Sequence, residues 1–193
     1  RSAVFGLGVC EFRKGDYENA KTHVGAVTDA DDVMAQSAYL FMGQMYLKDD
    51  NLNAAALAFE KAYKMPYDES TRETAFYNYA LAQSRGGRTP FSSSVKLFQD
   101  FLNKFPNSRY ASNVEDYIIN SYMTSKDYDN ALLCIEALKS PSAKMMKAKQ
   151  NVLYRLGMRE LQAGKTTSAA DFLTCADELA QYDFKVAQEV KLW

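Results

Sequence analysis

Apolar residues recur at helical spacing around five positions of the sequence: Gly8, Gly43, Ala80, Ile119 and Gly157. Large apolar side chains stand near most of these positions, about four residues before, one before or three after. They are Val4, Leu7, Tyr39, Met42, Tyr46, Phe76, Tyr79, Ile118, Tyr122, Leu153 and Leu156. This spacing places them on one side of an α-helix. The pattern therefore predicts five amphipathic helices.

A second series of mostly small residues follows the first: Ala20, Ala55, Ser94, Ala131 and Ala169. Each lies twelve residues after its counterpart, except Ser94, which lies fourteen residues after Ala80. The residues four and seven positions later are again mostly apolar, and they are Val24, Val27, Phe59, Ala62, Phe98, Phe101, Ile135, Leu138, Leu173 and Ala176. We therefore expect a second amphipathic helix after each of the first five, with small residues that let the two helices pack closely.

Turn-forming residues separate the predicted helices. The segments KGD, KDDN, RGGRTP, SKD and AGKT divide the two helices of each pair, with Gly for a left-handed turn or Asp, Asn or Thr as a helix cap. Between pairs stand TDADD, MPYDES, FPNSR and SPSAK, whose Pro, Asp and Asn residues end a helix. The sequence thus predicts an all-α fold, an α-solenoid of about five antiparallel helix-pair repeats plus the start of a sixth. We expect one solenoid over residues 1–193, with repeats at roughly 1–32, 33–69, 70–108, 109–142 and 143–182 and a partial repeat at 183–193.

The recurring residues resemble those of the tetratricopeptide repeat family. The matching residues are Leu7, Gly8, Gly15, Asp16, Tyr17 and Ala20 in the first repeat, Tyr39, Gly43, Tyr46, Ala55, Phe59 and Pro66 in the second, Tyr128 and Ala131 in the fourth, and Leu156, Gly157, Gly164 and Ala169 in the fifth. The resemblance implies that the first helices of the pairs line a concave face. The last segment, YDFKVAQEVKLW, resembles the opening helix of a sixth repeat. We therefore expect the chain to be a fragment of a longer protein.

Four residues depart from the family pattern. Glu11 and Glu160 stand where the family has an aromatic residue, and Glu115 stands where it has a large one. Ile119 replaces the small residue of the fourth repeat. Because a large side chain holds paired helices apart, we expect this pair to pack less closely than the others.

The segment SVKLFQDFLNKFPNSRYASNVEDYI, residues 94–118, is similar to tetratricopeptide proteins of bacterial cell envelopes, of the Tol–Pal coordinator and outer-membrane assembly lipoprotein type. This resemblance covers the third and fourth repeats only. It implies a periplasmic or outer-membrane-associated protein and leaves a cytoplasmic location open.

Composition excludes several classes of partner. Lys and Arg number 23 against 24 Asp and Glu, so no basic field exists to attract nucleic acid. The longest apolar runs reach about ten residues, short of the roughly 20 that a membrane span needs. Cys10, Cys134 and Cys175 form no CxxC pair, and the lone His23 has no thiol near it in the sequence. We expect no nucleic acid, no membrane span in this chain, no metal and no cofactor.

Three short motifs suggest chemistry but lack the residues that would complete it. SSVK at 93–96 matches the SxxK of penicillin-binding enzymes, but the companion SDN and KTG are missing. AGKTT at 163–167 has Arg159 where a phosphate-binding loop needs Gly. TDADD at 28–32 lacks the alternation and final Glu of a calcium loop. We therefore expect that the chain is not an enzyme.

A second stripe of residues lies beside the predicted core stripe on each first helix. Its candidate partner-binding residues are Phe5, Val9, Phe12, Arg13, Leu40, Gln44, Leu47, Lys48, Tyr77, Leu81, Arg85, Asn120, Met123, Tyr154 and Met158. A helix that is apolar on two adjacent faces is either buried on both or binds a partner. The stripe suits an extended peptide or an amphipathic helix of a protein partner. The alternative is that tight packing between repeats buries it.

The predicted function is that of a non-catalytic protein–protein interaction scaffold. The alternative is a regulatory or partner-recruiting arm of a larger signalling or catalytic protein. Chaperone-tail clamps of the family use Lys and Asn where this chain has Phe5 and Val9, Leu40 and Gln44, or Tyr77 and Leu81, which disfavours that mode. Glycan binding on Tyr77 and Tyr154 would need longer loops than these turns provide. The sequence indicates neither the partner's identity nor the oligomeric state.

Overall fold

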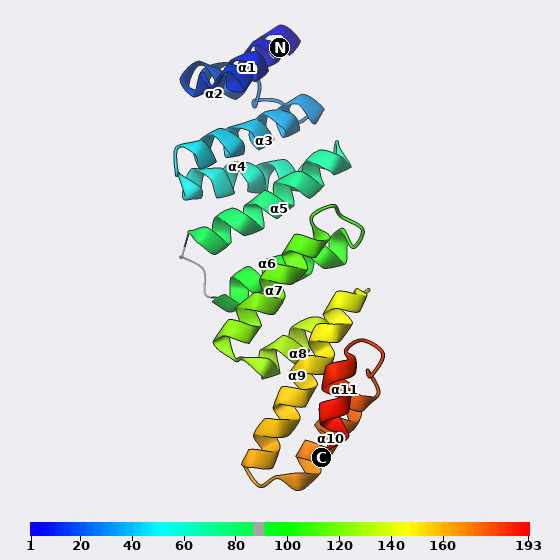
Figure 1. Ribbon diagram of the computed structural model, residues 1–193. Helices are drawn as coiled ribbons and strands as arrows, with labels where there is room; N and C mark the ends of the chain where they lie inside the picture. The colour runs from blue at the N-terminus through cyan, green and yellow to red at the C-terminus, as the bar shows by residue number, and fades with distance from the viewer. Residues whose placement is uncertain (87–90) are drawn as a thin grey trace. The chain divides into compact units, whose positions relative to one another are not determined.

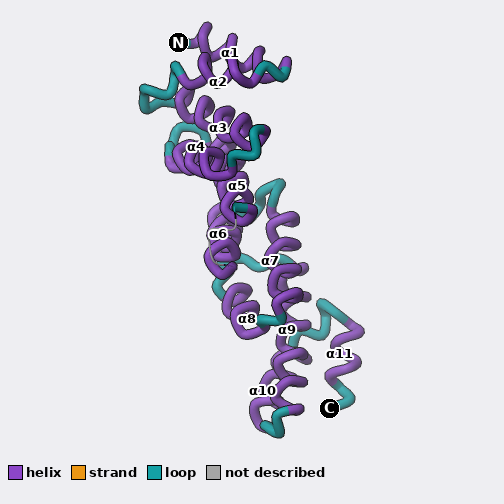
Figure 2. Tube along the Cα trace, turned by 90° about the vertical axis from the view of Figure 1, so that its left-hand side faces the viewer, coloured by secondary structure: helices purple, strands orange, loops and turns teal. Residues whose placement is uncertain are grey.

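The computed structural model describes residues 1–86 and 91–193, without the side chains of residues 91 and 92. Within these ranges the chain forms helices and no strand, as Figures 1 and 2 show. The helices are α1 (Ser2–Lys14), α2 (Tyr17–Gly25), α3 (Val33–Lys48), α4 (Leu52–Lys64), α5 (Glu69–Arg85), α6 (Phe91–Lys104), α7 (Ala111–Ser125), α8 (Tyr128–Glu136), α9 (Ala143–Gln162), α10 (Thr166–Asp177) and α11 (Phe184–Val190). The prediction of an all-α chain of helix pairs is confirmed.

Polar residues of the turns cap the helices. The caps accept a hydrogen bond from a backbone N–H in the first turn of the next helix, and they are Asp16, Asp32, Asn51, Asp68, Asp127, Ser142 and Asp183. Such a bond satisfies one of the N–H groups that a helix start leaves without a partner. Gly15 and Gly164 have positive φ, as expected for the turns KGD and AGKT. Of the predicted turn RGGRTP, residues 87–90 lie outside the described residues.

Three glycines mark the closest approach of paired helices. A side chain at any of these glycines would collide with a residue of the paired second helix. In each repeat this residue stands four positions after the small residue of the second series. The distances from an added Cβ to the nearest side-chain atom are 2.7 Å for Gly8 and Val24, 2.5 Å for Gly43 and Phe59, and 2.8 Å for Gly157 and Leu173. Atoms this close overlap, so only glycine fits without a shift of the neighbour.

The core lies between the two helices of each pair. All ten residues that were predicted to face inward from the second helices are buried, Phe59, Phe98 and Phe101 completely. The pair α7 and α8 makes fewer close contacts than the pairs α1/α2, α3/α4 and α9/α10. This looser packing agrees with the large side chain of Ile119, which is half-buried at the position where those pairs have glycine.

Two predicted core residues are exposed. Val4 and Leu7 of α1 are 37% and 48% exposed, so their assignment to the core is wrong. The corresponding residues of α9, Leu153 and Leu156, are only 4% and 1% exposed. The difference follows the packing of the two helices: α9 packs against α7, α8, α10 and α11, whereas α1, among the described residues, packs mainly against α2 and α3.

Buried glutamines connect neighbouring helix pairs. Gln36 of α3 is completely buried, and its Nε2 lies 3.1, 2.8 and 3.2 Å from the carbonyl oxygens of Ala62, Met65 and Asp68. Its Oε1 accepts a hydrogen bond of 2.7 Å from the backbone N–H of Asp68. One side chain therefore joins the end of α4 to the start of α5. We call this arrangement the Gln36 clasp.

The same position is polar in two other repeats. Gln150 stands seven residues before Gly157, as Gln36 stands before Gly43. Its Nε2 donates to the carbonyl of Asp183 at 3.1 Å, but its buried Oε1 has no partner. Arg1, seven residues before Gly8, donates to the carbonyl of Val27 at 2.7 Å and pairs with Asp32. The hydrogen bonds from Arg1 and from the backbone of Ala35 lower the pKa of Asp32 to about 2.

The chain divides into two compact units, the N-terminal unit Arg1–Phe101 and the C-terminal unit Leu102–Trp193. In the N-terminal unit, α3 packs against α1, α2, α4 and α5. In the C-terminal unit, α9 packs against α7, α8, α10 and α11. Each of these central first helices thus contacts its own partner helix and the helices of neighbouring pairs. A single solenoid over residues 1–193 stays a prediction.

Candidate protein-binding face

The candidate partner-binding residues of the stripe are accessible within each of the two compact units. None of its fifteen residues is buried, whereas five of the eleven residues in the neighbouring predicted core stripe are. Four are exposed, namely Arg13, Lys48, Arg85 and Asn120. The other eleven are half-buried. Packing between repeats thus covers one side of these side chains and leaves the other side open.

Two aromatic residues of α1 pack against the same aromatic ring of α3. The rings of Phe5 and Phe12 lie edge-on to Phe41 of α3, with centroid distances of 6.0 and 5.3 Å. Phe12 also contacts Tyr17, at 5.6 Å. This arrangement holds the two phenylalanines in place, so a partner would meet rigid apolar surface at low entropic cost.

The third repeat contributes Tyr77 and Leu81, one helical turn apart on α5. The Tyr77 ring lies 6.0 Å from the buried ring of Phe101 on α6. Leu81 is half-buried and so presents part of its side chain to solvent. Truncating Tyr77 would disturb the core as well as the face, whereas a change at Leu81 acts mainly on the face.

In the C-terminal unit the stripe is interrupted at Tyr154. This side chain packs against a buried cluster that α9, α10 and α11 form together, made of Leu153, Leu173, Ala176, Val186 and Val190. Burial raises the pKa of the Tyr154 hydroxyl, and the neighbouring carboxylate of Glu189 raises it further. Helix α11 thus covers part of Tyr154. Asn120, Met123 and Met158 remain exposed or half-buried.

The described residues outside the stripe offer few sites for chemistry. Within them, no group of three or more His, Cys, Asp or Glu side chains is placed to hold a metal ion. His23 Nδ1 lies 2.7 Å from Glu11 Oε2, so these two side chains are hydrogen-bonded to each other. Cys10 and Cys175 are exposed free thiols on α1 and α10, and Cys134 is buried. None of the helices described here is both long and apolar enough to cross a membrane.

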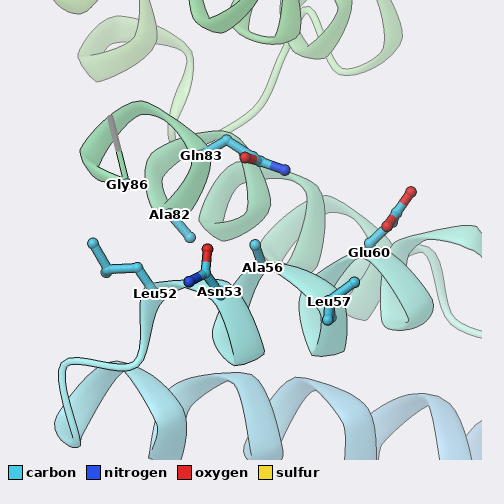
Figure 3. A pocket seen from close by; sticks show the side chains of 8 residues that line it. All are labelled: Leu52, Asn53, Ala56, Leu57, Glu60, Ala82, Gln83 and Gly86. Carbon is cyan, nitrogen blue, oxygen red and sulfur yellow. The ribbon is translucent and has the colours of Figure 1, made fainter. Parts of the chain in front are cut away.

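A pocket lies between α4 and α5, apart from the stripe. Its volume is about 270 Å³. Figure 3 shows Ala56 of α4 and Ala82 of α5 pointing into the space between the two helices. The lining residues are Leu52, Asn53, Ala56, Leu57, Glu60, Ala82, Gln83 and Gly86. Small side chains on both helices leave this space unfilled, and none of the stripe residues takes part in it.

Comparison with known proteins identifies the repeat in one part of the chain. Residues 74–108 match the tetratricopeptide repeat family model. They comprise most of α5 and all of α6, and so most of the predicted third repeat. A search of curated proteins finds no match.

Two solved structures are similar to the chain over nearly its whole length. The first, "Crystal structure of MamA protein", has a TM-score of 0.55 and 16% sequence identity, and covers 95% of this chain and 93% of that chain. The second, "Crystal structure of MamA", has a TM-score of 0.51 and 17% identity, and covers 93% of this chain and 97% of that one. At this identity the similarity shows the fold, which is a tetratricopeptide-type stacking of helix pairs.

Proposed function

We propose that this protein is a non-catalytic scaffold that binds a peptide or helix of another protein on the face formed by its first helices. One observation carries the proposal: within each compact unit, apolar side chains of the stripe are half-buried on the first helices and keep part of their surface open to solvent. Half-buried aromatic and aliphatic side chains are the usual anchors of protein interfaces. The tetratricopeptide-type fold supports the same function, since stacked helix pairs form extended binding surfaces.

We propose the bacterial cell envelope as the setting, either the periplasm or the outer-membrane surface. This proposal is supported only by the resemblance of residues 94–118 to envelope tetratricopeptide proteins. Fractionation of the native organism with an antibody against the chain would test it. Recovery in the cytosolic fraction would refute it.

The binding face can be tested by selecting peptides from a random display library on the immobilised protein. The double variant Leu47→Glu/Leu81→Glu changes two half-buried stripe residues on α3 and α5. We expect it to weaken binding of the selected peptides by about tenfold or more, because it places two charges against apolar anchors. Fluorescence anisotropy with labelled peptides measures the loss.

Leu57→Glu is the matched control for this experiment. Leu57 lies on α4, outside the stripe, and is 63% exposed. The same chemical change there should leave the affinity unaltered. Peptides that bind the double variant as well as the wild type, with both proteins fully helical, would refute the proposed face.

A further inference from the structure

Three basic residues repeat along one edge of the stripe in the N-terminal unit. Arg13, Lys48 and Arg85 each stand five residues after the small residue of their repeat, in the last turn of α1, α3 and α5. All three are exposed, and within residues 1–86 and 93–193 none of them makes an ion pair. In the same unit Lys21 pairs with Glu18 and Asp49, and Lys64 pairs with Glu60.

The helix dipole alone does not account for this row. A cation in the last turn of a helix is favoured by the partial negative charge there. However, Lys14 already supplies one on α1, and the last turn of α7 has no basic residue. The equivalent positions of the fourth and fifth repeats hold Thr124 and Gln162. At this position of the repeat, the cations are thus confined to the first three repeats.

The fold aligns the three cations. Helices α1, α3 and α5 run in the same direction, each with its C-terminal end on the left of Figure 1. Helix α3 packs directly against both α1 and α5. Helices in contact have axes about 8–10 Å apart. Axes this far apart would place the three cations in steps of about 8–10 Å beside the apolar strip.

An extended chain in the polyproline II conformation matches these steps. It has three residues per turn and rises about 3.1 Å per residue, so every third residue faces the same way at intervals of about 9 Å. Carboxylates at such positions could each meet one cation. The residues between them would face the apolar strip.

From this charge complementarity we propose that the N-terminal unit binds an acidic, extended segment of another protein, with a carboxylate at every third residue and apolar residues between. The inference rests on the proposed function and names the chemistry of its partner. The cations set the register of the segment and speed its association, and the apolar contacts supply most of the affinity.

A synthetic peptide tests the proposal directly. The probe is the sequence Glu-Leu-Pro repeated about four times, which favours polyproline II. The wild-type chain should bind it, and the affinity should fall as NaCl rises from about 50 mM to about 500 mM. The triple variant Arg13→Glu/Lys48→Glu/Arg85→Glu should bind it at least about tenfold more weakly. Fluorescence anisotropy reports both effects.

Two controls separate position from overall charge. The variant Lys14→Glu/Lys96→Glu/Lys139→Glu makes the same change in net charge at three other exposed residues and should keep wild-type affinity. A peptide of identical composition with its glutamates grouped at one end should bind the wild type more weakly than the probe.

Several results would overturn the proposal. They are failure of the wild type to bind the probe, equal binding by the Arg13, Lys48 and Arg85 variant, and equal binding of the regrouped peptide. If library-selected peptides still require Leu47 and Leu81 while any of these results is found, only the acidic-partner inference fails. If the binding of those peptides is also unaffected by the changes at Leu47 and Leu81, then both the acidic-partner inference and the proposed function fail.

Discussion

At the scale of single residues, the glycines at the helix crossings explain how apolar side chains of the second helices fit between paired helices. Gly43 lies under the ring of Phe59, which is completely buried and has no solvent-facing side to move into. Gly8 and Gly157 have flexible or smaller aliphatic neighbours, Val24 and Leu173. We therefore expect Gly43 to be the least tolerant of the three glycines.

The substitution Gly43→Ala should destabilise the protein. The added Cβ would lie 2.5 Å from the Phe59 ring, and overpacking of this kind costs about 1–3 kcal/mol. Urea denaturation followed by circular dichroism measures the change. Gly6→Ala on α1 is the matched control, because nothing lies within 4 Å of its added Cβ. Alanine there should raise the stability of the helix by about 0.5–1 kcal/mol. A Gly43→Ala variant as stable as the wild type would show that the crossing has more room than the structure indicates.

At the scale of the helices, the buried side chain of Gln36 connects the end of α4 to the start of α5 by hydrogen bonds. The end of α4 and the start of α5 expose carbonyl and N–H groups that no backbone partner satisfies within either helix. Gln36 reaches these groups from α3 with both atoms of its amide. The equivalent Gln150 makes one such bond, to Asp183 before α11. The first connection is therefore complete and the second is partial.

Replacement of Gln36 by leucine should cost about 3 kcal/mol of unfolding free energy, because it leaves several buried backbone groups without a partner. Gln150→Leu should cost about 1 kcal/mol of unfolding free energy, because it removes only one hydrogen bond. It also removes the buried Oε1 atom, which has no hydrogen-bond partner in the wild type. Chemical denaturation of the two variants gives the comparison. Equal losses would contradict a special role of the Gln36 clasp.

At the scale of the whole molecule, each helix pair depends mainly on its neighbours. Helix α3 is supported by α1, α2, α4 and α5, and α9 by α7, α8, α10 and α11. Stability in such a chain is approximately a sum of contributions from each repeat and from the contacts between adjacent repeats. Damage in one compact unit should therefore remain largely within that unit.

Hydrogen exchange of the variant Gly157→Leu tests this independence. The larger side chain would collide with Leu173 and loosen α9 and α10. We expect amide protection in these helices to fall by about tenfold or more, while protection in α3 and α4 changes little. Wild-type protein under the same conditions is the reference. A parallel loss of protection in both compact units would mean that the chain unfolds as a single cooperative body.

Much of the fold was predictable because its signals are local. Gly43 and Ala55 lie twelve residues apart on two helices joined by a short turn, so their spacing alone predicts a close crossing. Asp68 and Asp127 cap helices that begin directly after them, which sequence shows equally well. The candidate face was predictable as a set of positions on the first helices, since helical periodicity determines which residues share a side. How far each of those side chains is covered depends on neighbouring repeats and was not predictable.

The sequence by itself determined the helix pairs, their turns and the small residues at their crossings. The physical reason is that the residues in contact within a pair are close together in the sequence, and the same pattern recurs in each repeat. Only the tertiary structure decided that Val4 and Leu7 are exposed, that Tyr154 is partly covered by α11 and that Gln36 joins three helices. These features involve residues from different repeats. Their positions depend on how one pair stacks on the next, and a pattern within a single pair carries no information about that geometry.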